Sequence, residues 1–173
     1  MPDVLHLEDF HMTRLHVDWL EPKAKGKRPV SVQSQVSMNY DVMRRRTDKR
    51  LFALVLRFQF GPEKDQPQAG YAIDAEIAGL FRFPESLSEG DMQKLIRING
   101  GMILYGILRG QIAGFTGSFP HGKFTLPAVY MPDVVATVES GKKASGTSQQ
   151  RHASSTKASR TKRAVSRSAP TKH

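Results

Sequence analysis

The chain has 173 residues, of which 39% are hydrophobic, so it can form one domain with a modest core, with or without a tail. It has no cysteine, which excludes a disulfide framework and a thiolate metal site. The formal net charge of +10 is unevenly placed: residues 1–139 hold 17 Lys and Arg against 16 Asp and Glu (17 − 16 = +1), and residues 140–173 hold 9 Lys and Arg and no acid. We therefore expect a nearly neutral folded domain over 1–139 and a basic tail over 140–173.

Alternation of apolar and polar residues predicts the first strands. Residues 5–20 alternate imperfectly, which predicts an extended segment with a β-bulge near Thr13 or Arg14. Residues 30–42 and 51–60 alternate cleanly on either side of a short charged turn. They therefore predict an antiparallel hairpin, each strand having one wet face.

A further strand and a helix follow the hairpin. The strand covers 71–77 and carries Asp74 and Glu76 on its wet face. Gly79 interrupts the alternation after it, as a β-bulge would. Residues 84–96 predict a helix, because the stretch from Ser88 to Asp91 contains Ser, Glu and Asp, which suit an N-terminus, and a short apolar stripe follows it.

Residues 102–116 predict a second helix with two distinct faces. The apolar face consists of Leu104, Leu108, Ile112 and Phe115. Another face repeats glycine every four residues, at Gly106, Gly110 and Gly114. A strip without side chains lets another backbone come close, either the sheet or a second subunit. Residues 124–135 contain two prolines and predict an extended segment along an edge of the sheet.

Residues 140–173 consist mainly of Ser, Thr, Ala, Lys and Arg and contain no aromatic residue. Such a segment buries too little apolar surface to offset its ordering entropy, so we expect a disordered tail. Nine cations without acids predict salt-sensitive contact with nucleic acid or with an acidic partner. A purely solubilising tail is the alternative interpretation.

No catalytic motif is present, so we expect no enzyme and no cofactor. The sequence lacks a phosphate-binding Gly-x-x-x-x-Gly-Lys loop, a Gly-x-Ser-x-Gly elbow and a His-Glu-x-x-His pair. His6, His11 and His16 are spaced by five, which on a regular strand alternates faces and predicts no metal site. The N-terminal residues lack the pattern of a signal peptide, and the longest apolar run is too short for a membrane span. We therefore expect a cytoplasmic protein.

Three stretches, in this order and spacing, resemble the SecB family of protein-export chaperones. The stretch from Ala75 to Phe81 is similar to a strand pattern of the family, with Glu, two residues, Gly, an aliphatic residue and Phe. The stretch from Asn99 to Arg109 resembles the start of its long helix, and that from Phe119 to Met131 resembles the loop after it. The family continues into a second long helix, for which only residues 133–139 remain here before the tail.

The resemblance implies an α+β fold, a four-stranded antiparallel sheet with helices packed on one face. It also implies an ATP-independent holdase that binds unfolded or nascent polypeptides for export. The expected partners are unfolded preproteins, the export motor SecA, and three further copies of the chain in a dimer of dimers. Two alternatives stay open: service to a toxin–antitoxin pair, as in SecB-like relatives, or nucleic-acid binding through the tail.

The resemblance also suggests candidate sites, each of which has an ordinary structural alternative. The client-binding candidates, which ordinary packing would equally explain, are Trp19, Leu20, Phe124, Val129 and Met131. The partner-docking candidates, which would otherwise form a solvated acidic strand face, are Asp18, Asp74 and Glu76. The candidates for the oligomer interface are Gly106, Arg109, Gly110 and Gly114.

Overall fold

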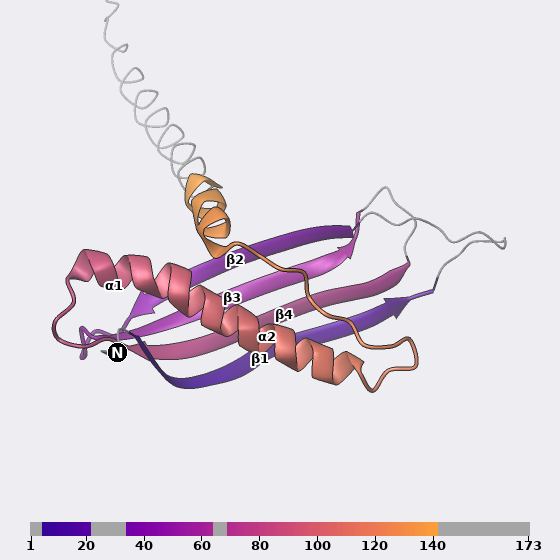
Figure 1. The fold of residues 1–173 in the computed structure, drawn as a ribbon, viewed down its shortest axis with the longest axis horizontal. Coiled ribbons are helices and arrows are strands. Elements are labelled where there is room, and N and C mark those ends of the chain that lie inside the picture. The colour runs from indigo at the N-terminus through magenta and orange to yellow at the C-terminus, as the bar shows by residue number, and fades with distance from the viewer. Residues whose placement is uncertain (1–4, 22–33, 64–68, 142–173) are drawn as a thin grey trace, which may run out of the picture. The chain divides into compact units, whose positions relative to one another are not determined.

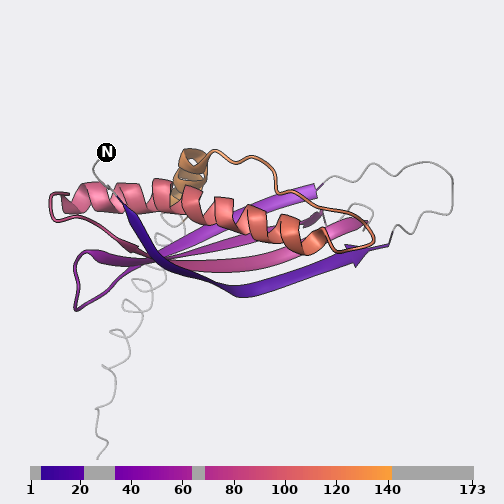
Figure 2. The same ribbon diagram turned by 60° about the horizontal axis from the view of Figure 1, so that its bottom comes forward.

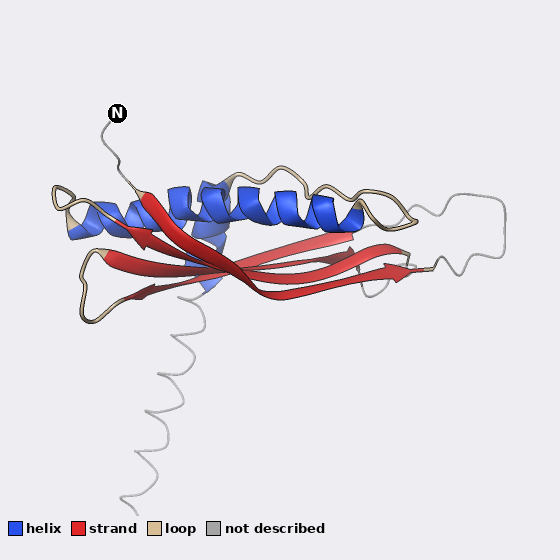
Figure 3. Ribbon diagram, turned by 90° about the horizontal axis from the view of Figure 1, so that it is seen from below, coloured by secondary structure: helices blue, strands red, loops and turns tan. Residues whose placement is uncertain are grey.

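The computed structural model describes residues 5–21, 34–63 and 69–141, in a single open sheet with helices on one of its faces (Figures 1 and 3). The strands are β1 (His6–Leu20), β2 (Ser34–Arg44), β3 (Leu51–Pro62) and β4 (Gly70–Arg82). They are antiparallel and lie in the order β1-β4-β3-β2. The expected α+β architecture is confirmed, including the hairpin, which is formed by β2 and β3.

Some expectations concern residues outside this description. They are the first four residues of the predicted second strand (30–33) and residues 142–173 of the predicted tail. The disorder and the contacts expected of that tail therefore stay predictions.

The two predicted helices form one continuous helical stretch, which crosses the sheet in Figure 2. It consists of α1 (Glu89–Leu95), a π-helical segment η1 (Ile96–Gly100) and α2 (Gly101–Thr116). At its start, the hydroxyl of Ser88 accepts a hydrogen bond of 3.2 Å from the backbone N–H of Asp91, so the polar residues near 88 act as predicted. None of the described helices is both long and apolar enough to cross a membrane.

The core lies between this helical stretch and the two central strands. Its fully buried side chains include Phe52, Leu54, Leu56 and Phe58 of β3, Ile77 and Phe81 of β4, and Ile96, Leu104, Leu108 and Ile112 of the helices. The predicted apolar face of α2 is therefore confirmed over three of its four residues. Phe115 is 47% exposed, and Thr116 is buried in its place. The inward-facing row of the helix continues from Ile112 by four residues, which leads to Thr116.

Gly79 marks a close approach of helix and sheet. The pairing of β4 with β3 runs through Gly79 without a register shift, and the alternation of inward residues continues from Ile77 to Phe81. The predicted bulge at Gly79 is therefore wrong. A Cβ atom placed on Gly79 would lie 2.7 Å from Cδ2 of Leu104, so the missing side chain gives the helix room to pack on the sheet.

The bulge predicted near Thr13 is confirmed by a register shift between Met12 and Arg14, and a second shift lies between Leu7 and Asp9. Each shift inserts one residue into β1 and reverses the alternation beyond it. As a result, the residues of β1 that pair with inward positions of β4 are Leu7, Phe10, Met12, Leu15, Val17 and Trp19. Two bulges thus make an irregular sequence into a strand with one apolar face.

The segment after α2 differs from its prediction. Residues 122–130 have no regular secondary structure, and residues 131–141 are helical, so the expected extended conformation ends at Tyr130. The ring of Phe124 lies 4.7 Å from that of Phe60, and the Tyr105 hydroxyl donates a 2.6 Å hydrogen bond to the Pro127 carbonyl. The segment therefore lies against α2 and a central strand, and the expectation of a sheet edge is wrong.

The chain divides into two compact units after Val135, so the described residues 136–141 are treated by themselves. They continue the helical conformation, and the hydroxyl of Ser140 donates to the carbonyl of Ala136 at 2.8 Å. Pro132, near the start of this helix, suits a first turn because the N–H that proline lacks has no helical partner there.

Candidate functional site

Four aromatic rings cross the sheet near the ends of β1 and β3 and the start of β4. We call them the aromatic row: Trp19, Tyr71, Phe124 and Phe60. Successive ring centroids lie 5.1, 5.4 and 4.7 Å apart, which is the range of favourable aromatic pairs. Trp19 pairs directly with Tyr71 in the β1–β4 register. The row thus joins an edge strand to both central strands through a residue that follows α2.

Hydrogen bonds fix the place of Phe124 in this row. The hydroxyl of Thr116, the one buried polar side chain among the described residues, accepts from the N–H of Phe124 at 2.9 Å and donates to the Ile112 carbonyl at 2.7 Å. The Tyr71 hydroxyl donates at 2.6 Å to the carbonyl of Gly122, whose φ of +89° favours glycine. The end of α2 and β4 therefore hold the loop that carries Phe124.

The predicted client-binding residues do not share one environment. Trp19 and Phe124 meet in the aromatic row and are half-buried, and Leu20 follows Trp19 with similar exposure. Val129 is half-buried further along the segment. Met131 is 1% exposed, and its sulfur would lie 3.0 Å from a Cβ atom on Gly101. The structure therefore places Met131 in the core, where its side chain packs on the helix and offers no surface.

Trp19 carries an unsatisfied hydrogen-bond donor. Its indole Nε1 is buried and has no acceptor among the residues that the structure describes. An unpaired buried donor costs about 1–3 kcal/mol relative to a satisfied one. Trp19 is thus half-buried and unsatisfied at its nitrogen, a combination that suits a contact residue better than a core residue.

The inner faces of the two edge strands are incompletely covered. The helical stretch packs mainly on β3 and β4. On β2, Val36 is 43% exposed and Met38 is half-buried, while on β1 Phe10 is 41% exposed. We call Val36, Met38 and Val42 the β2 strip. It continues the aromatic row, because Val36 pairs with Phe60 in the register of β2 and β3.

The two edges of the sheet also differ in their backbones. β2 pairs with β3 over its whole length without a register shift, and it contains neither Pro nor Lys. β1 carries two bulges. Bulges, proline and lysine are the usual means by which a protein prevents another strand from pairing with an edge. Among the described residues no strand pairs with the outer edge of β2, so this edge suits strand addition better than β1 does.

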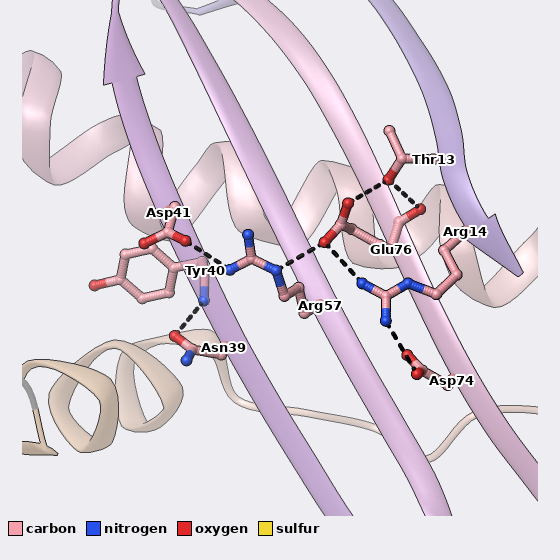
Figure 4. A network of polar contacts seen from close by, with 8 residues as sticks. All are labelled: Thr13, Arg14, Asn39, Tyr40, Asp41, Arg57, Asp74 and Glu76. Carbon is pink, nitrogen blue, oxygen red and sulfur yellow. Dashed lines mark hydrogen bonds and ion pairs between the residues drawn. The ribbon is translucent and has the colours of Figure 1, made fainter.

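A network of ion pairs covers the outer face of the sheet, opposite the helices (Figure 4). Glu76 accepts from Thr13 at 2.6 Å and from Arg57 at 2.7 Å, and Arg14 lies 3.4 Å away. Arg57 also pairs with Asp41 at 2.6 Å. The hydrogen bonds from Thr13 and Arg57 hold the pKa of the Glu76 carboxyl below its ordinary value.

The partner-docking candidates on this face differ in exposure and in the number of neighbours that they bind. The side chain of Glu76 is 17% exposed and tied to three neighbours. Asp74 is 36% exposed and pairs with Arg14 at 3.2 Å. Asp18 is 53% exposed and lies 2.8 Å from His16. Glu76 is therefore built into the sheet, and Asp18 and Asp74 present more carboxylate surface.

The three histidines of β1 lie on this same outer face. His6, His11 and His16 pair with Arg82, Ala78 and Asp74, all outward positions of β4. The expectation that they alternate faces is wrong, because each bulge restores the parity that a spacing of five removes. Their partners are four residues apart, or about 13 Å at roughly 3.3 Å per residue, which is too far for a shared ion. The described residues contain no group of three metal ligands.

The glycine row of α2 faces away from the sheet. Cβ atoms on Gly106, Gly110 and Gly114 would meet nothing within 4 Å, and Arg109 is exposed beside them. Exposed hydrophobic residues flank the row, namely Met102, Ile103 and Phe115. The glycine row therefore does not pack on the sheet. Of the two interpretations, contact with a second subunit is the one that stays a prediction.

Sequence reasoning missed three members of the aromatic end of the sheet: Phe60, Tyr71 and His121. The first two lie at the end and the start of the predicted strands 51–60 and 71–77, but neither was named as a site residue. In an antiparallel pair the end of one strand lies beside the start of the next, so the positions of Phe60, Tyr71 and Trp19 carried a usable signal. Nothing in the sequence places His121, because its position depends on the loop.

Comparisons with known proteins support the fold. No family model and no curated protein matches the chain. A solved SecB-like chaperone from Mycobacterium tuberculosis, in complex with a ChAD peptide from an antitoxin, aligns with a TM-score of 0.56 and 16% identity over 73% of this chain and 91% of that one. A protein of unknown function from Streptococcus agalactiae aligns with a TM-score of 0.38 and 14% identity, over 72% and 97% of the two chains. The chain has a SecB-like fold, as its sequence predicts.

The Glu76 network predicts a pH-dependent loss of stability. A folded-state pKa below the ordinary one stabilises the fold above the ordinary carboxyl range, and the contribution disappears as pH falls through the lowered pKa. Glu76→Gln should therefore lower the free energy of unfolding by about 1–2 kcal/mol at pH 7. The difference from wild type should shrink below about pH 4.

Urea unfolding at pH 7 and pH 3 measures this difference. The control is Glu85→Gln, an exposed carboxylate whose side chain forms no hydrogen bond or ion pair with the described residues. A Glu76→Gln effect that is the same at both pH values, or that is matched by the control, contradicts the assignment.

Proposed function

We propose that the chain is an ATP-independent holdase chaperone that binds unfolded or nascent polypeptides and catalyses no reaction. The observation that carries the proposal is the aromatic row and its continuation into the partly exposed β2 strip. Trp19 and Phe124 are half-buried in the row, and Val36 is 43% exposed beside it. Together they form an apolar track next to an unprotected sheet edge.

An extended polypeptide fits this track by ordinary sheet chemistry. A strand added to the outer edge of β2 forms main-chain hydrogen bonds that do not depend on the sequence of the client. Its alternate side chains then lie over the β2 strip, and larger ones reach the aromatic row. Burial of these side chains supplies the favourable free energy, since unfolded chains expose the apolar residues that folded chains bury. Broad recognition without a catalytic group is what a holdase requires.

The solved relative supports a polypeptide ligand, because that SecB-like chaperone was determined with a peptide from an antitoxin. For the present chain we propose two kinds of client: polypeptides destined for export, or a dedicated antitoxin. Export would use SecA, docked on the outer face of the sheet. Since Glu76 is occupied by its neighbours, we assign the main docking contacts to Asp18 and Asp74. We place this activity in the cytoplasm.

Charge favours a second candidate function. Residues 140–173 hold nine cations and no acid, which suits salt-sensitive binding to nucleic acid or to an acidic partner. The tail has no aromatic residue on which bases can stack. This candidate differs from the holdase in its response to salt, because screening weakens phosphate contacts far more than apolar ones.

The holdase proposal predicts that the full chain suppresses the aggregation of a chemically unfolded test protein at near-stoichiometric ratios. Trp19→Ala and Phe124→Ala should each raise the concentration needed for half-suppression about tenfold, since buried aromatic residues dominate such contacts. Met43→Ala, a control on the outer face of β2 and 54% exposed, should leave it unchanged. Light scattering measures suppression, and circular dichroism checks that each variant is folded.

Raising the salt from about 50 to 200 mM should preserve suppression. If the wild-type chain fails to suppress aggregation but binds DNA or RNA in a salt-sensitive way, the holdase proposal is wrong and the second candidate function, binding through the tail, takes its place.

We also propose that the chain forms a homo-tetramer, a dimer of dimers, in which the exposed glycine row of α2 forms one of the two kinds of interface. Gly106, Gly110 and Gly114 are open to solvent, and Met102, Ile103 and Phe115 beside them are at least 36% exposed. A row of small residues lets two helices approach closely, and the flanking hydrophobic residues are buried when they do. Arg109, exposed on the same helix, completes the proposed interface.

Gly110→Leu should reduce the mass in solution from that of a tetramer, because the new side chain stands where the second helix packs. Gly90→Leu is the matched control, since a Cβ at Gly90 on α1 also meets nothing within 4 Å. Light scattering coupled to size-exclusion chromatography gives both masses. A monomeric wild type, or a Gly110→Leu mass equal to that of wild type, excludes this interface.

A further inference from the structure

His121 lies flat on Trp19 at the end of the aromatic row. The two ring centroids are 4.1 Å apart and the planes are 5° from parallel. Tyr71 contacts the same indole edge-on, at 5.1 Å and 75°. The imidazole thus occupies a stacking position that suits any planar side chain, and it belongs to an exposed residue of the loop after α2.

His121 is held in this position weakly. Within the described residues its imidazole forms no hydrogen bond or ion pair, and the stack on Trp19 is its only ring contact. The loop itself is anchored elsewhere, through the 2.6 Å bond from Tyr71 to the carbonyl of Gly122 and the 3.1 Å bond from the Gly122 N–H to Phe119. A rotation of the His121 side chain therefore uncovers Trp19 without breaking either anchor.

In the stacked arrangement the Trp19 Nε1–H is buried and has no hydrogen-bond partner within the described part of the chain. A bound polypeptide brings carbonyl groups, which are the acceptors that this donor lacks. The stack with His121 thus leaves the Trp19 N–H without an acceptor, whereas a stack with a client residue can come with one. A client ring in the place of His121 would keep the stacking energy, and the client backbone would bring acceptors toward the indole.

We propose that His121 is a displaceable cap on the client site: in the free protein it occupies the position on Trp19 that an aromatic side chain of a bound polypeptide takes. The inference rests on the proposed holdase function and assigns a specificity-determining residue to the same surface. It follows that aromatic client residues compete with His121, whereas aliphatic ones gain little from its displacement. The fraction of uncapped protein then sets the apparent affinity for aromatic clients.

Trp19 is the sole tryptophan of the chain, so its fluorescence reports on this position alone. Two polar peptides that differ only in a single Phe or Leu serve as probes of the full-length protein. His121→Ala should bind the Phe peptide about threefold to tenfold more tightly than wild type does. His121→Phe, a better stacking partner, should bind it more weakly. The Leu peptide should change less in both variants, and His11→Ala, which removes an exposed histidine of β1, should change neither.

A second readout needs no client. Quenching of Trp19 fluorescence by acrylamide should increase in His121→Ala and decrease in His121→Phe. Unchanged affinity for the Phe peptide in His121→Ala, or an equal gain for the Leu peptide, overturns the cap while leaving the holdase proposal intact. A wild-type chain that binds neither peptide overturns the holdase proposal, and the cap with it.

Discussion

One helical layer covers a sheet that is too wide for it, and the rest of the structure depends on this mismatch. An α-helix with its side chains is about 10 Å across, whereas four strands at about 4.8 Å spacing need roughly twice that width of cover. The helical stretch packs mainly on the central strands β3 and β4, where the fully buried residues of the sheet lie. Val36 on one edge strand and Phe10 on the other stay more than a third exposed. A domain of this design therefore keeps apolar surface available on both sides of its helix.

Glycines set how closely the helix can approach the sheet and what its other face can do. Gly79 and Gly100 lie at the inner interface, where Cβ atoms would come within 3.1 Å of side chains of the core. Gly106 and Gly110 stand on the outer face with open space around them. Glycine thus allows the helix and the sheet to pack closely at the inner interface, and it leaves the outer face of the helix without side chains at these positions. Only the structure distinguishes these two uses.

The sequence predicted the four strands well because period-two alternation is a strong signal when one face of a sheet is buried. It also predicted the bulge near Thr13, where the alternation visibly fails. It missed the bulge between Leu7 and Asp9, because both sides of that bulge are partly polar. The expected alternation of the three histidines on a regular strand left out both bulges, the one that was missed and the one that was predicted near Thr13. The bulge expected at Gly79 was wrong because a missing side chain looks the same in sequence whether it kinks a strand or admits a neighbour.

The site was predictable in part. Resemblance to SecB pointed to Trp19 and Phe124, which lie in one row, but not to Tyr71, which joins them. The contacts of Tyr71 with Trp19 and Phe124 depend on the pairing of the first strand with the fourth and on the hydrogen bonds of Thr116. Neither of these can be predicted from the local sequence pattern. Met131 was misplaced because a helix begins there, and its side chain fills the space above Gly101.

Hydrogen–deuterium exchange of the full chain, with and without a bound unfolded polypeptide, tests the central claim most directly. The claim is that clients bind along β2 and the aromatic row. Protection of the backbone amides of β2, of the loop that carries Phe124 and of the end of β1 at Trp19, with the rest of β1 unchanged, is the predicted result. Protection confined to β1, to the outer acidic face or to residues 140–173 would contradict it.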